Sequence, residues 1–304
     1  MQESLASRGI VDSMAAVKKP VLLLVFLALV FGATGAQAIT YGQPDGNRHP
    51  NVGAMIRFRE ADDIYPADLY RIVCSGSLIA PTVFLTASHC TSFVQSFDPP
   101  YNDVWVTFDP HPFPTGNDPL ITNSTLPVTA IHGTICTGPL KCTNPLYSQR
   151  QSDPGDIAVI ILDHAPPGID PVVLPDVGLL DDMRATGELK SALFTNVGYG
   201  TEEPVPGPGG VSNAFHQERR YSVSSFWAMT STWLLLNQNK AAGSAGTCSG
   251  DSGGPQFLGA GANETNTQVS ITIKGDAFCF ATNWVYRLDT PQAREFLDDF
   301  VTLP

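Results

Sequence analysis

Ser252 lies in the segment CSGDSGGP, residues 248–255, where glycines flank it on both sides. Glycine loses more backbone entropy on folding than any other residue, so several glycines around one serine need a conformational reason. A tight surface turn is one such reason. Another is that main-chain N–H groups must come within hydrogen-bonding distance of a group that lies against Ser252. The second arrangement would suit nucleophilic catalysis, which also requires a base, because a serine hydroxyl is a weak nucleophile at its ordinary pKa.

His89 is the histidine whose surroundings best suit such a base. It sits in the run LTASHC, where an apolar strand ends and Cys90 follows at once. A disulfide at Cys90 would hold the imidazole in place, as general acid–base catalysis requires. Asp156 opens the apolar run DIAVIIL, where a carboxylate is costly to bury without a partner. Asp156 is therefore the candidate to orient His89. The alternative is a capping or surface aspartate, and Asp153 lies nearby, but only Asp156 directly precedes the apolar run.

The segments TASHC, DIAV and CSGDSGGP, in that order, resemble the three signature segments of the chymotrypsin/trypsin-like serine proteases. The resemblance implies that His89 acts as general base and then acid, that Asp156 fixes its tautomer, and that Ser252 attacks the scissile carbonyl. It also implies that the N–H groups of Gly250 and Ser252 form an oxyanion hole. The implied function is a secreted serine endopeptidase that hydrolyses peptide bonds through an acyl-enzyme.

The resemblance extends over most of residues 39–304. NVGYG at 196–200 resembles the family's glycine-aromatic-glycine turn, and VVLP at 172–175 resembles its inter-barrel segment. GDS also occurs in a lipase/esterase family, but there it follows the first strand, whereas here it lies near the end of the chain. The alternative within the same family is a non-catalytic or substrate-occluded homologue that acts as a binding protein. Such homologues usually lack a triad residue, and this chain keeps all three.

Short β-rich runs separated by turn residues predict an all-β fold. Examples are VGAMIRF, DVWVTF, QVSITIKG and TNWVYRL. Together with the resemblance, they predict one peptidase domain over 39–304, built from two six-stranded antiparallel β-barrels and a C-terminal helix. The first barrel is expected over about 39–165, the second over about 176–289, and the helix over 290–301, with Thr290 as its N-cap and Pro291 at its first position. TEEPVPGPGG, residues 201–210, is expected to be a surface loop.

Six cysteines, an even number in a chain that is expected to be exported, imply disulfides. The resemblance implies that Cys74–Cys90 braces His89 and that Cys248–Cys279 ties the nucleophile loop to the wall of the substrate pocket. The remaining pair, Cys136–Cys142, would close a local loop. No CxxC pair occurs and no pair of histidines lies near Cys136 and Cys142, so a zinc site is not expected. No clear ligand spacing for calcium is present either, and no cofactor is expected.

Residues 1–38 are interpreted as an N-terminal extension and a secretory signal peptide. KKP precedes the apolar run VLLLVFLALVF, and AQA forms a cleavage site that ends at Ala38. The apolar run is too short to span a bilayer as a stable helix, and no stable membrane insertion is expected. The mature protein is therefore expected to be secreted, either to the extracellular space or to the periplasm.

Ile39-Thr40-Tyr41-Gly42 resembles the mature start of the protease family. In that family the new α-amine pairs with the aspartate before the nucleophile, which here is Asp251. Because a buried carboxylate needs a cation, this pairing would order the nucleophile loop. The hypothesis is that signal peptidase itself creates the activating N-terminus. The alternative is that Ile39 is merely a processed end.

The substrate pocket departs from the family at several positions. Gly246 stands where trypsins carry the aspartate that selects lysine or arginine, and Thr247 lies beside it. Asp276 lies in the aligned wall of the pocket and would recruit a basic side chain at P1, the residue before the scissile bond. Trp284 falls where a small residue usually leaves the pocket open, so it would instead favour small P1 side chains. Both remain hypotheses at this point.

The composition limits the partners. The 304 residues carry a net charge of −12, which argues against nucleic acid or an anionic membrane surface as a partner. Polypeptide substrates are expected, and proteinaceous inhibitors are a further class of partner that the resemblance allows.

Overall fold

The structure is a computed structural model, and it describes six ranges of residues. They are 39–60, 69–97, 102–113, 125–207, 210–213 and 215–304. The predicted signal peptide over 1–38 lies outside this described part.

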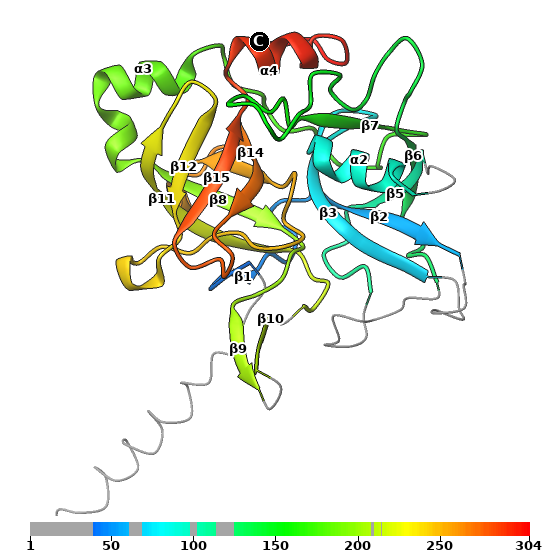
Figure 1. Ribbon diagram of the computed structural model, residues 1–304, viewed down its shortest axis with the longest axis horizontal. Helices are drawn as coiled ribbons and strands as arrows, with labels where there is room; N and C mark the ends of the chain where they lie inside the picture. The colour runs from blue at the N-terminus through cyan, green and yellow to red at the C-terminus, as the bar shows by residue number, and fades with distance from the viewer. Residues whose placement is uncertain (1–38, 61–68, 98–101, 114–124, 208–209, 214) are drawn as a thin grey trace, which may run out of the picture. The chain divides into compact units, whose positions relative to one another are not determined.

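Six strands close the first barrel in the order β2-β3-β4-β7-β6-β5, and every neighbouring pair is antiparallel (Figure 1). Its apolar runs form these strands because β-branched and aromatic side chains pack well on a pleated surface. The strands are β2 (Val52–Arg59), β3 (Leu69–Ala80), β4 (Val83–Thr86), β5 (Asp103–Thr107), β6 (Ile131–Thr134) and β7 (Ala158–Leu162).

The second barrel closes in the order β8-β11-β12-β15-β14-β13, with β8 paired to β11. Counted from its own first strand, each barrel therefore has the strand order 1-2-3-6-5-4. This pair of closed six-stranded antiparallel barrels matches the chymotrypsin-like fold, and the fold prediction is confirmed. The strands are β8 (Leu193–Gly198), β11 (Arg220–Met229), β12 (Trp233–Asn237), β13 (Pro255–Leu258), β14 (Gln268–Gly275) and β15 (Thr282–Arg287).

Buried polar side chains join the two barrels. Ser77 Oγ of β3 donates to Gln268 Oε1 of β14 at 2.6 Å, and both residues are fully buried. The Tyr199 hydroxyl after β8 donates to the carbonyl of Asp109 at 2.9 Å. A buried polar group is costly unless it is hydrogen-bonded, so these pairs fix how one barrel meets the other.

The N-terminal strand β1 (Gln43–Pro44) belongs to the second barrel. It pairs with β11, with Gln43 opposite Tyr221, although the first barrel was expected to begin at about residue 39. A buried ion pair explains why β1 joins the second barrel. Arg219 Nε lies 2.8 Å from Asp45 Oδ2, and both side chains are fully buried. The segment before β2 is therefore held against the strand that Arg219 precedes.

The C-terminal helix α4 (Pro291–Leu297) is confirmed, but it ends before the predicted residue 301. The Thr290 hydroxyl accepts a hydrogen bond from the Ala293 amide at 3.3 Å, as expected of an N-cap. Two further helices, α2 (Ser88–Gln95) and α3 (Leu179–Thr186), were not predicted. Three short 3-10 turns complete the helical elements: η1 (Glu188–Ser191), η2 (Lys240–Ala242) and η3 (Gly261–Asn263).

The expected surface loop over 201–210 contains a strand. β9 (Pro204–Gly207) pairs antiparallel with β10 (Gly210–Asn213) in a separate two-stranded ribbon. The many proline and glycine residues of this segment hid the strand pattern, since both residue types are rare in strands.

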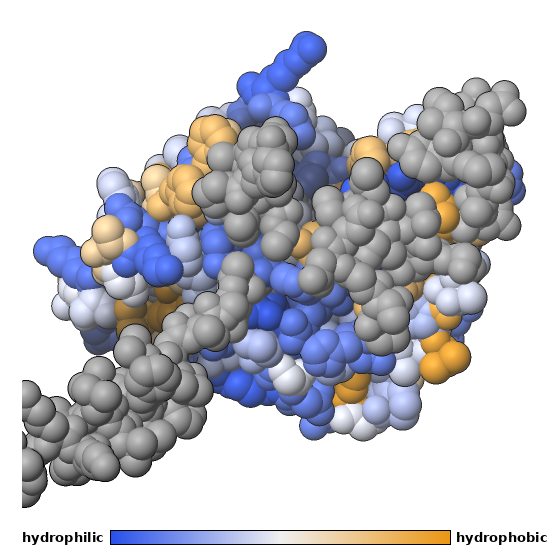
Figure 2. Space-filling view, turned by 90° about the horizontal axis from the view of Figure 1, so that it is seen from below, coloured by the Kyte–Doolittle hydropathy of each residue, from blue (hydrophilic) through white to orange (hydrophobic). Residues whose placement is uncertain are grey.

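Apolar side chains are mainly inside the barrels. Figure 2 shows that, on the face seen from below, the described surface is largely hydrophilic and its apolar residues form small separate patches. In the part of the chain that the structure describes, no helix is both long and apolar enough to span a membrane.

Candidate active site

His89 and Asp156 are joined by two hydrogen bonds at the start of α2. The Asp156 carboxylate accepts from the His89 amide at 2.8 Å through Oδ1 and contacts His89 Nδ1 at 2.9 Å through Oδ2. Only 3% of the Asp156 side chain is exposed, against 24% for His89. Asp156 therefore caps the first turn of α2 and fixes the imidazole ring with the same carboxylate.

This contact determines the tautomer of neutral His89. An ionised carboxylate only accepts hydrogen bonds, so Nδ1 must carry the hydrogen. Nε2 is then the acceptor, which is the form that a general base requires. Ser88 supports the arrangement, because its hydroxyl donates to the Ile157 carbonyl at 2.7 Å and fixes the chain directly after Asp156.

The nucleophile loop lies against the segment that carries His89. The Ser252 carbonyl accepts a hydrogen bond from the Ser75 amide at 2.9 Å and lies 3.9 Å from Cys90 Sγ. Within the described ranges, no hydrogen bond joins the Ser252 hydroxyl to His89. Such contacts are often long in serine hydrolases without substrate and shorten when substrate binds.

Ser75 of β3 positions this loop through its side chain as well. Its hydroxyl donates to the Gly250 carbonyl at 3.0 Å and accepts from the Tyr199 amide at 2.9 Å. Ser75 is fully buried and belongs to the first barrel, whereas its partners belong to the second. Sequence analysis missed this positioning residue, although its place directly after Cys74 was a usable signal.

Gly253 allows the loop to approach the first barrel. A Cβ atom there would lie 2.3 Å from Thr86 Oγ1 and 2.5 Å from the Ser75 carbonyl oxygen, and its φ of +80° also favours glycine. The glycines around Ser252 therefore serve a close approach of backbones rather than a surface turn alone.

Replacing Gly253 by alanine should destabilise the protein more than the same change at Gly243. Gly243 has a similar φ of +75°, but nothing lies within 4 Å of the position that its Cβ would occupy. Gly243→Ala should cost about 1–2 kcal/mol for the left-handed conformation. Gly253→Ala should cost about 1–3 kcal/mol more, because the added methyl group overpacks the barrel contact. Urea unfolding measures the free energy of unfolding of both variants. Equal losses of stability would show that the Ser252 loop does not need a glycine at 253 to approach the first barrel.

Three amides of the loop, those of Ser249, Gly250 and Ser252, have no acceptor among the described residues. The N–H groups of Asp251, Gly253 and Gly254 each donate to a main-chain carbonyl. Those of Gly250 and Ser252 donate to no acceptor among the described residues. Gly250 has a φ of +97°, and a Cβ there would lie 2.9 Å from the Cα of Gly200. The two amides that the resemblance assigns to an oxyanion hole are thus available to a ligand.

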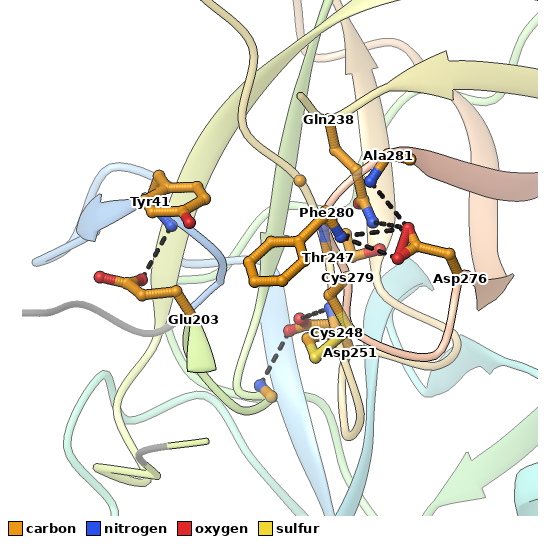
Figure 3. Close-up of a disulfide and its surroundings, with 12 residues drawn as sticks. Tyr41, Glu203, Gln238, Thr247, Cys248, Asp251, Asp276, Cys279, Phe280 and Ala281 are labelled. Carbon is orange, nitrogen blue, oxygen red and sulfur yellow. Dashed lines mark hydrogen bonds between the residues drawn. A yellow bond between two sulfur atoms is a disulfide. The ribbon is translucent and has the colours of Figure 1, made fainter. Parts of the chain in front are cut away.

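Asp251 is fully buried between the loop and the turn NVGYG. Its carboxylate accepts hydrogen bonds from the amides of Gly200 and Cys248, both at 2.8 Å (Figure 3). A Cβ at Gly198 or Gly200 would overlap this carboxylate, at 2.2 and 2.5 Å from its atoms. Burial raises the pKa of Asp251 to about 7, because the two hydrogen bonds only partly offset the loss of solvent.

Ile39 lies near this region but does not contact Asp251 in the described contacts. Ile39 is fully buried with a φ of +49°, and the Thr40 carbonyl accepts from the Gly246 amide at 3.2 Å. In the full chain the nitrogen of Ile39 is a peptide amide and carries no charge. The pairing of Ile39 with Asp251 stays a prediction about the processed chain.

A cavity of about 240 Å³ opens beside Ser252. Two of the predicted pocket residues, Thr247 and Asp276, line it together with the Cys248–Cys279 disulfide. The Asp276 carboxylate accepts hydrogen bonds from the amides of its own loop, including that of Ala281 at 2.8 Å (Figure 3). These bonds lower the pKa of Asp276 despite its partial burial, so the cavity wall carries a negative charge.

The other two predicted pocket residues, Gly246 and Trp284, are not among those that line the cavity. Trp284 instead packs edge-to-face on Trp233, with ring centroids 5.8 Å apart. A β-bulge between Thr272 and Lys274 shifts the register so that Trp284 lies opposite Lys274. Trp284 therefore does not shorten the cavity.

Gln238 occupies the space beside Gly246. A Cβ at Gly246 would lie 2.0 Å from Gln238 Oε1, and this oxygen accepts from the Thr247 amide at 3.1 Å. Its Nε2 donates to Asp276 at 3.4 Å, so Gln238 links two residues of the cavity wall (Figure 3). Sequence analysis missed Gln238 because it ends an apolar run with no motif around it.

The disulfides are the pairs that sequence analysis expected: Cys74–Cys90, Cys136–Cys142 and Cys248–Cys279. The ligand atoms of Cys74, His89 and Cys90 all lie within 4.8 Å of one another. Both sulfurs belong to a disulfide, so this group offers no thiolate to a metal ion.

Comparison with known proteins adds no family. Neither the family models nor the curated protein sequences contain a match to this chain. The functional interpretation therefore depends on the fold and on the geometry of the site.

Proposed function

We propose that this protein is a secreted serine endopeptidase in which His89, Asp156 and Ser252 form the catalytic triad. The proposal rests on one arrangement: the Asp156 carboxylate binds both the amide and Nδ1 of His89, on the segment against which the Ser252 loop is packed. The available amides of Gly250 and Ser252 support it further. The glycines around Ser252 and the buried carboxylate of Asp156 both cost stability. A protein that only binds a ligand would not need these features together.

The proposed reaction has two halves. In the first, His89 Nε2 takes the Ser252 hydroxyl proton as Oγ bonds to the scissile carbonyl carbon. The carbonyl oxygen becomes an oxyanion that accepts hydrogen bonds from the Gly250 and Ser252 amides. The C–N bond then breaks as His89 gives the proton to the leaving amine. The acyl group remains bonded to Ser252 Oγ as an ester. In the second half, His89 activates a water that hydrolyses this ester and restores the serine.

Hydrolysis of a mixture of internally quenched peptides tests this function. The chain beginning at Ile39 should cleave at least one of them, and phenylmethylsulfonyl fluoride should abolish the cleavage. Ser252→Ala should remove cleavage at unchanged folding, whereas Ser249→Ala in the same loop should retain most of it. Equal cleavage by Ser252→Ala and the unmodified chain would reject the proposal.

The same proposal assigns activation to the new N-terminus at Ile39. Asp251 is buried with two amide partners, and an α-ammonium group would neutralise its charge. Signal peptidase cleavage after Ala38 would create this group, so export would be the activation step. A chain with one extra residue before Ile39 should then have little activity, and full activity of that chain would reject this role.

The pH dependence of stability should differ between these two forms. In the longer form the folded-state pKa of Asp251 is about 7 and lies above that of the unfolded chain. The contribution of Asp251 to stability is therefore fully present below about pH 4 and is lost as the pH rises to and through 7. In the form beginning at Ile39, pairing should keep Asp251 ionised and remove this loss. The free energy of unfolding of each form, measured from pH 4 to 8, gives this loss of stability. Identical pH profiles of the two forms would contradict the pairing of Ile39 with Asp251.

Asp276 makes a basic P1 side chain the favoured substrate feature. It places a carboxylate in the wall of the cavity beside Ser252, whereas Trp284 lies elsewhere. Among peptides with Ala, Val, Leu or Arg at P1, the Arg peptide should have the highest kcat/KM. Asp276→Asn should lower its kcat/KM about tenfold or more through the lost charge, with little change for the Leu peptide. A preference for Ala would contradict this assignment.

A further inference from the structure

One edge of β14 is unpaired beside the Ser252 cavity. β13 pairs with β14 only as far as Ile271, whereas β15 pairs with its other edge as far as Gly275. Among the described residues, no strand pairs with the first edge over residues 273–275. These three residues also line the cavity beside Ser252. A strand edge with free main-chain groups accepts an extended peptide as an added strand.

The substrate segment before the scissile bond suits this edge, if the proposed function holds. The carbonyl of P1 must reach Ser252 while its side chain enters the cavity that Asp276 lines, so the chain before P1 continues along β14. Successive side chains of an extended chain point to opposite faces. The side chains at P2 and P4, the second and fourth residues counted back from the scissile bond, therefore point away from the cavity. The P3 side chain points to the same face as that of P1.

Lys274 places a positive charge outside the cavity on this part of β14. Its ammonium nitrogen lies 5.0 Å from the ring centroid of Trp233 and 5.3 Å from that of Trp284. Neither indole is among the residues that line the cavity, so the ammonium group lies over the indoles rather than in the cavity. Such cation–π contacts orient an ammonium group without neutralising its charge.

The indole of Trp233 is itself held in place. Its Nε1 donates to the carbonyl of Ser152 at 3.1 Å, and its ring packs edge-to-face on that of Tyr286, with centroids 6.1 Å apart. Ser152 belongs to the first-barrel loop that leads to Asp156. The support under Lys274 is therefore tied to the loop that carries a residue of the proposed triad.

Lys274 and Asp276 hold their opposite charges with different partners. Within the described part of the chain, no ion pair includes Lys274, and the residue is exposed. The Asp276 carboxylate is bound instead by amides of its own loop, including those of Phe280 and Ala281. Both charges are therefore available to a substrate. On a chain with a net charge of −12, a local positive site determines where an acidic side chain binds.

We propose that Lys274 selects an acidic side chain at P2 or P4 of the substrate. This inference rests on the proposed function and adds a substrate class to it. The carboxylate would lie against the ammonium group, and the aliphatic stem that carries it would pack on the indoles of Trp233 and Trp284. With a basic P1 residue facing Asp276, the preferred substrate has an acidic residue one or three positions before a basic one.

Matched internally quenched peptides that share the best-cleaved P1 residue test this selection. Glu, Gln or Lys stands in turn at P2, P3 or P4, and the other residues are kept. We expect Glu to have a kcat/KM about fivefold higher than Gln at P2 or P4, with Lys lowest, and the advantage should fall as salt is raised. The position with the advantage identifies the residue that pairs with Lys274. At P3 the three peptides should be cleaved about equally.

Variants of Lys274 separate its charge from a structural role. Lys274→Gln should remove the advantage of Glu, and Lys274→Glu should reverse the order so that the Lys peptide is cleaved fastest. Because each ratio compares substrates of one enzyme, partial loss of folded protein cancels. Lys190→Gln removes the same charge from the exposed surface of η1 and should leave the ratio unchanged.

Three results would overturn the proposal while leaving the proposed function intact. They are equal cleavage of the Glu and Gln peptides at P2 and P4, an advantage of Glu confined to P3, and an advantage that Lys274→Gln retains. Cleavage of none of the peptides would count against the proposed function itself, and binding then decides the role of Lys274.

Calorimetric titration of Ser252→Ala with peptides that end at P1 measures this binding without turnover. Tighter binding of the peptide with Glu at P2 or P4 than of its Gln counterpart, lost in Lys274→Gln, would still support selection by Lys274. Equal binding of the Glu and Gln peptides would reject it.

Discussion

Replacing Asp156 by asparagine is expected to lower kcat by about 10⁴-fold while the protein stays folded. Asp156 Oδ1 accepts the His89 amide, so the carbonyl oxygen of an asparagine should keep that position. Its NH₂ group would then face His89 Nδ1, which would have to become an acceptor. The hydrogen would move to Nε2, and His89 could no longer take the proton of Ser252.

Asp153→Asn is the matched control for this prediction. Asp153 lies three residues earlier and accepts hydrogen bonds from the Gly155 amide and the Tyr286 hydroxyl, both at 3.0 Å, instead of from His89. Its replacement should change kcat less than tenfold. Nitrogen NMR of the imidazole should show the hydrogen on Nδ1 in the unmodified protein and on Nε2 in Asp156→Asn. Similar losses of kcat in both variants would mean that His89 is not oriented by Asp156.

Replacing Arg219 by methionine is expected to destabilise the protein by about 3–5 kcal/mol. The Arg219 side chain is fully buried against Asp45 and donates to the carbonyls of Val52 and Phe108 at 3.0 and 2.8 Å. Methionine would fill similar space but leave the Asp45 carboxylate buried without this cation. Asp45 would keep its side-chain contact with His49, but this contact neutralises the carboxylate only when the imidazole is protonated.

Arg184→Met separates this effect from a general loss of charge. Arg184 pairs with Asp181 on the surface, where about half of each side chain is exposed, and such pairs contribute under about 1 kcal/mol. Thermal unfolding should therefore show a fall in Tm of roughly 10 °C for Arg219→Met and little change for Arg184→Met. A small effect at Arg219 would mean that the N-terminal segment is not anchored by this ion pair.

The parts of the site that sequence analysis predicted are those with local signals. Glycines must surround Ser252 because Cβ atoms would collide with Thr86 and Ser75, and this constraint is visible as a motif. The apolar run after Asp156 likewise shows where a carboxylate must be buried. The arrangement of the strands in two barrels was predicted from the resemblance, since alternation of apolar residues does not specify which strands pair.

The parts that were missed depend on contacts between distant residues. Helix α2 begins after Ala87, whose side chain makes no capping hydrogen bond, and its cap is Asp156, 67 residues beyond His89. No local pattern shows such a cap. The position of Trp284 depends on a bulge in the neighbouring strand β14, which moves its partner by one residue. Helix α3, in contrast, has Gly187 as its C-cap and acidic residues in its first turn, so its sequence held usable signals.

Covalent labelling with a fluorophosphonate tests the central claim most directly. The reagent should react when His89 removes the proton of Ser252, Oγ bonds to phosphorus and fluoride leaves. Mass spectrometry of the chain beginning at Ile39 should show one adduct per molecule, located on Ser252 and absent in His89→Ala. Absence of an adduct on the folded, correctly processed chain would contradict an assembled triad, and the protein would then be a non-catalytic or substrate-occluded binding protein.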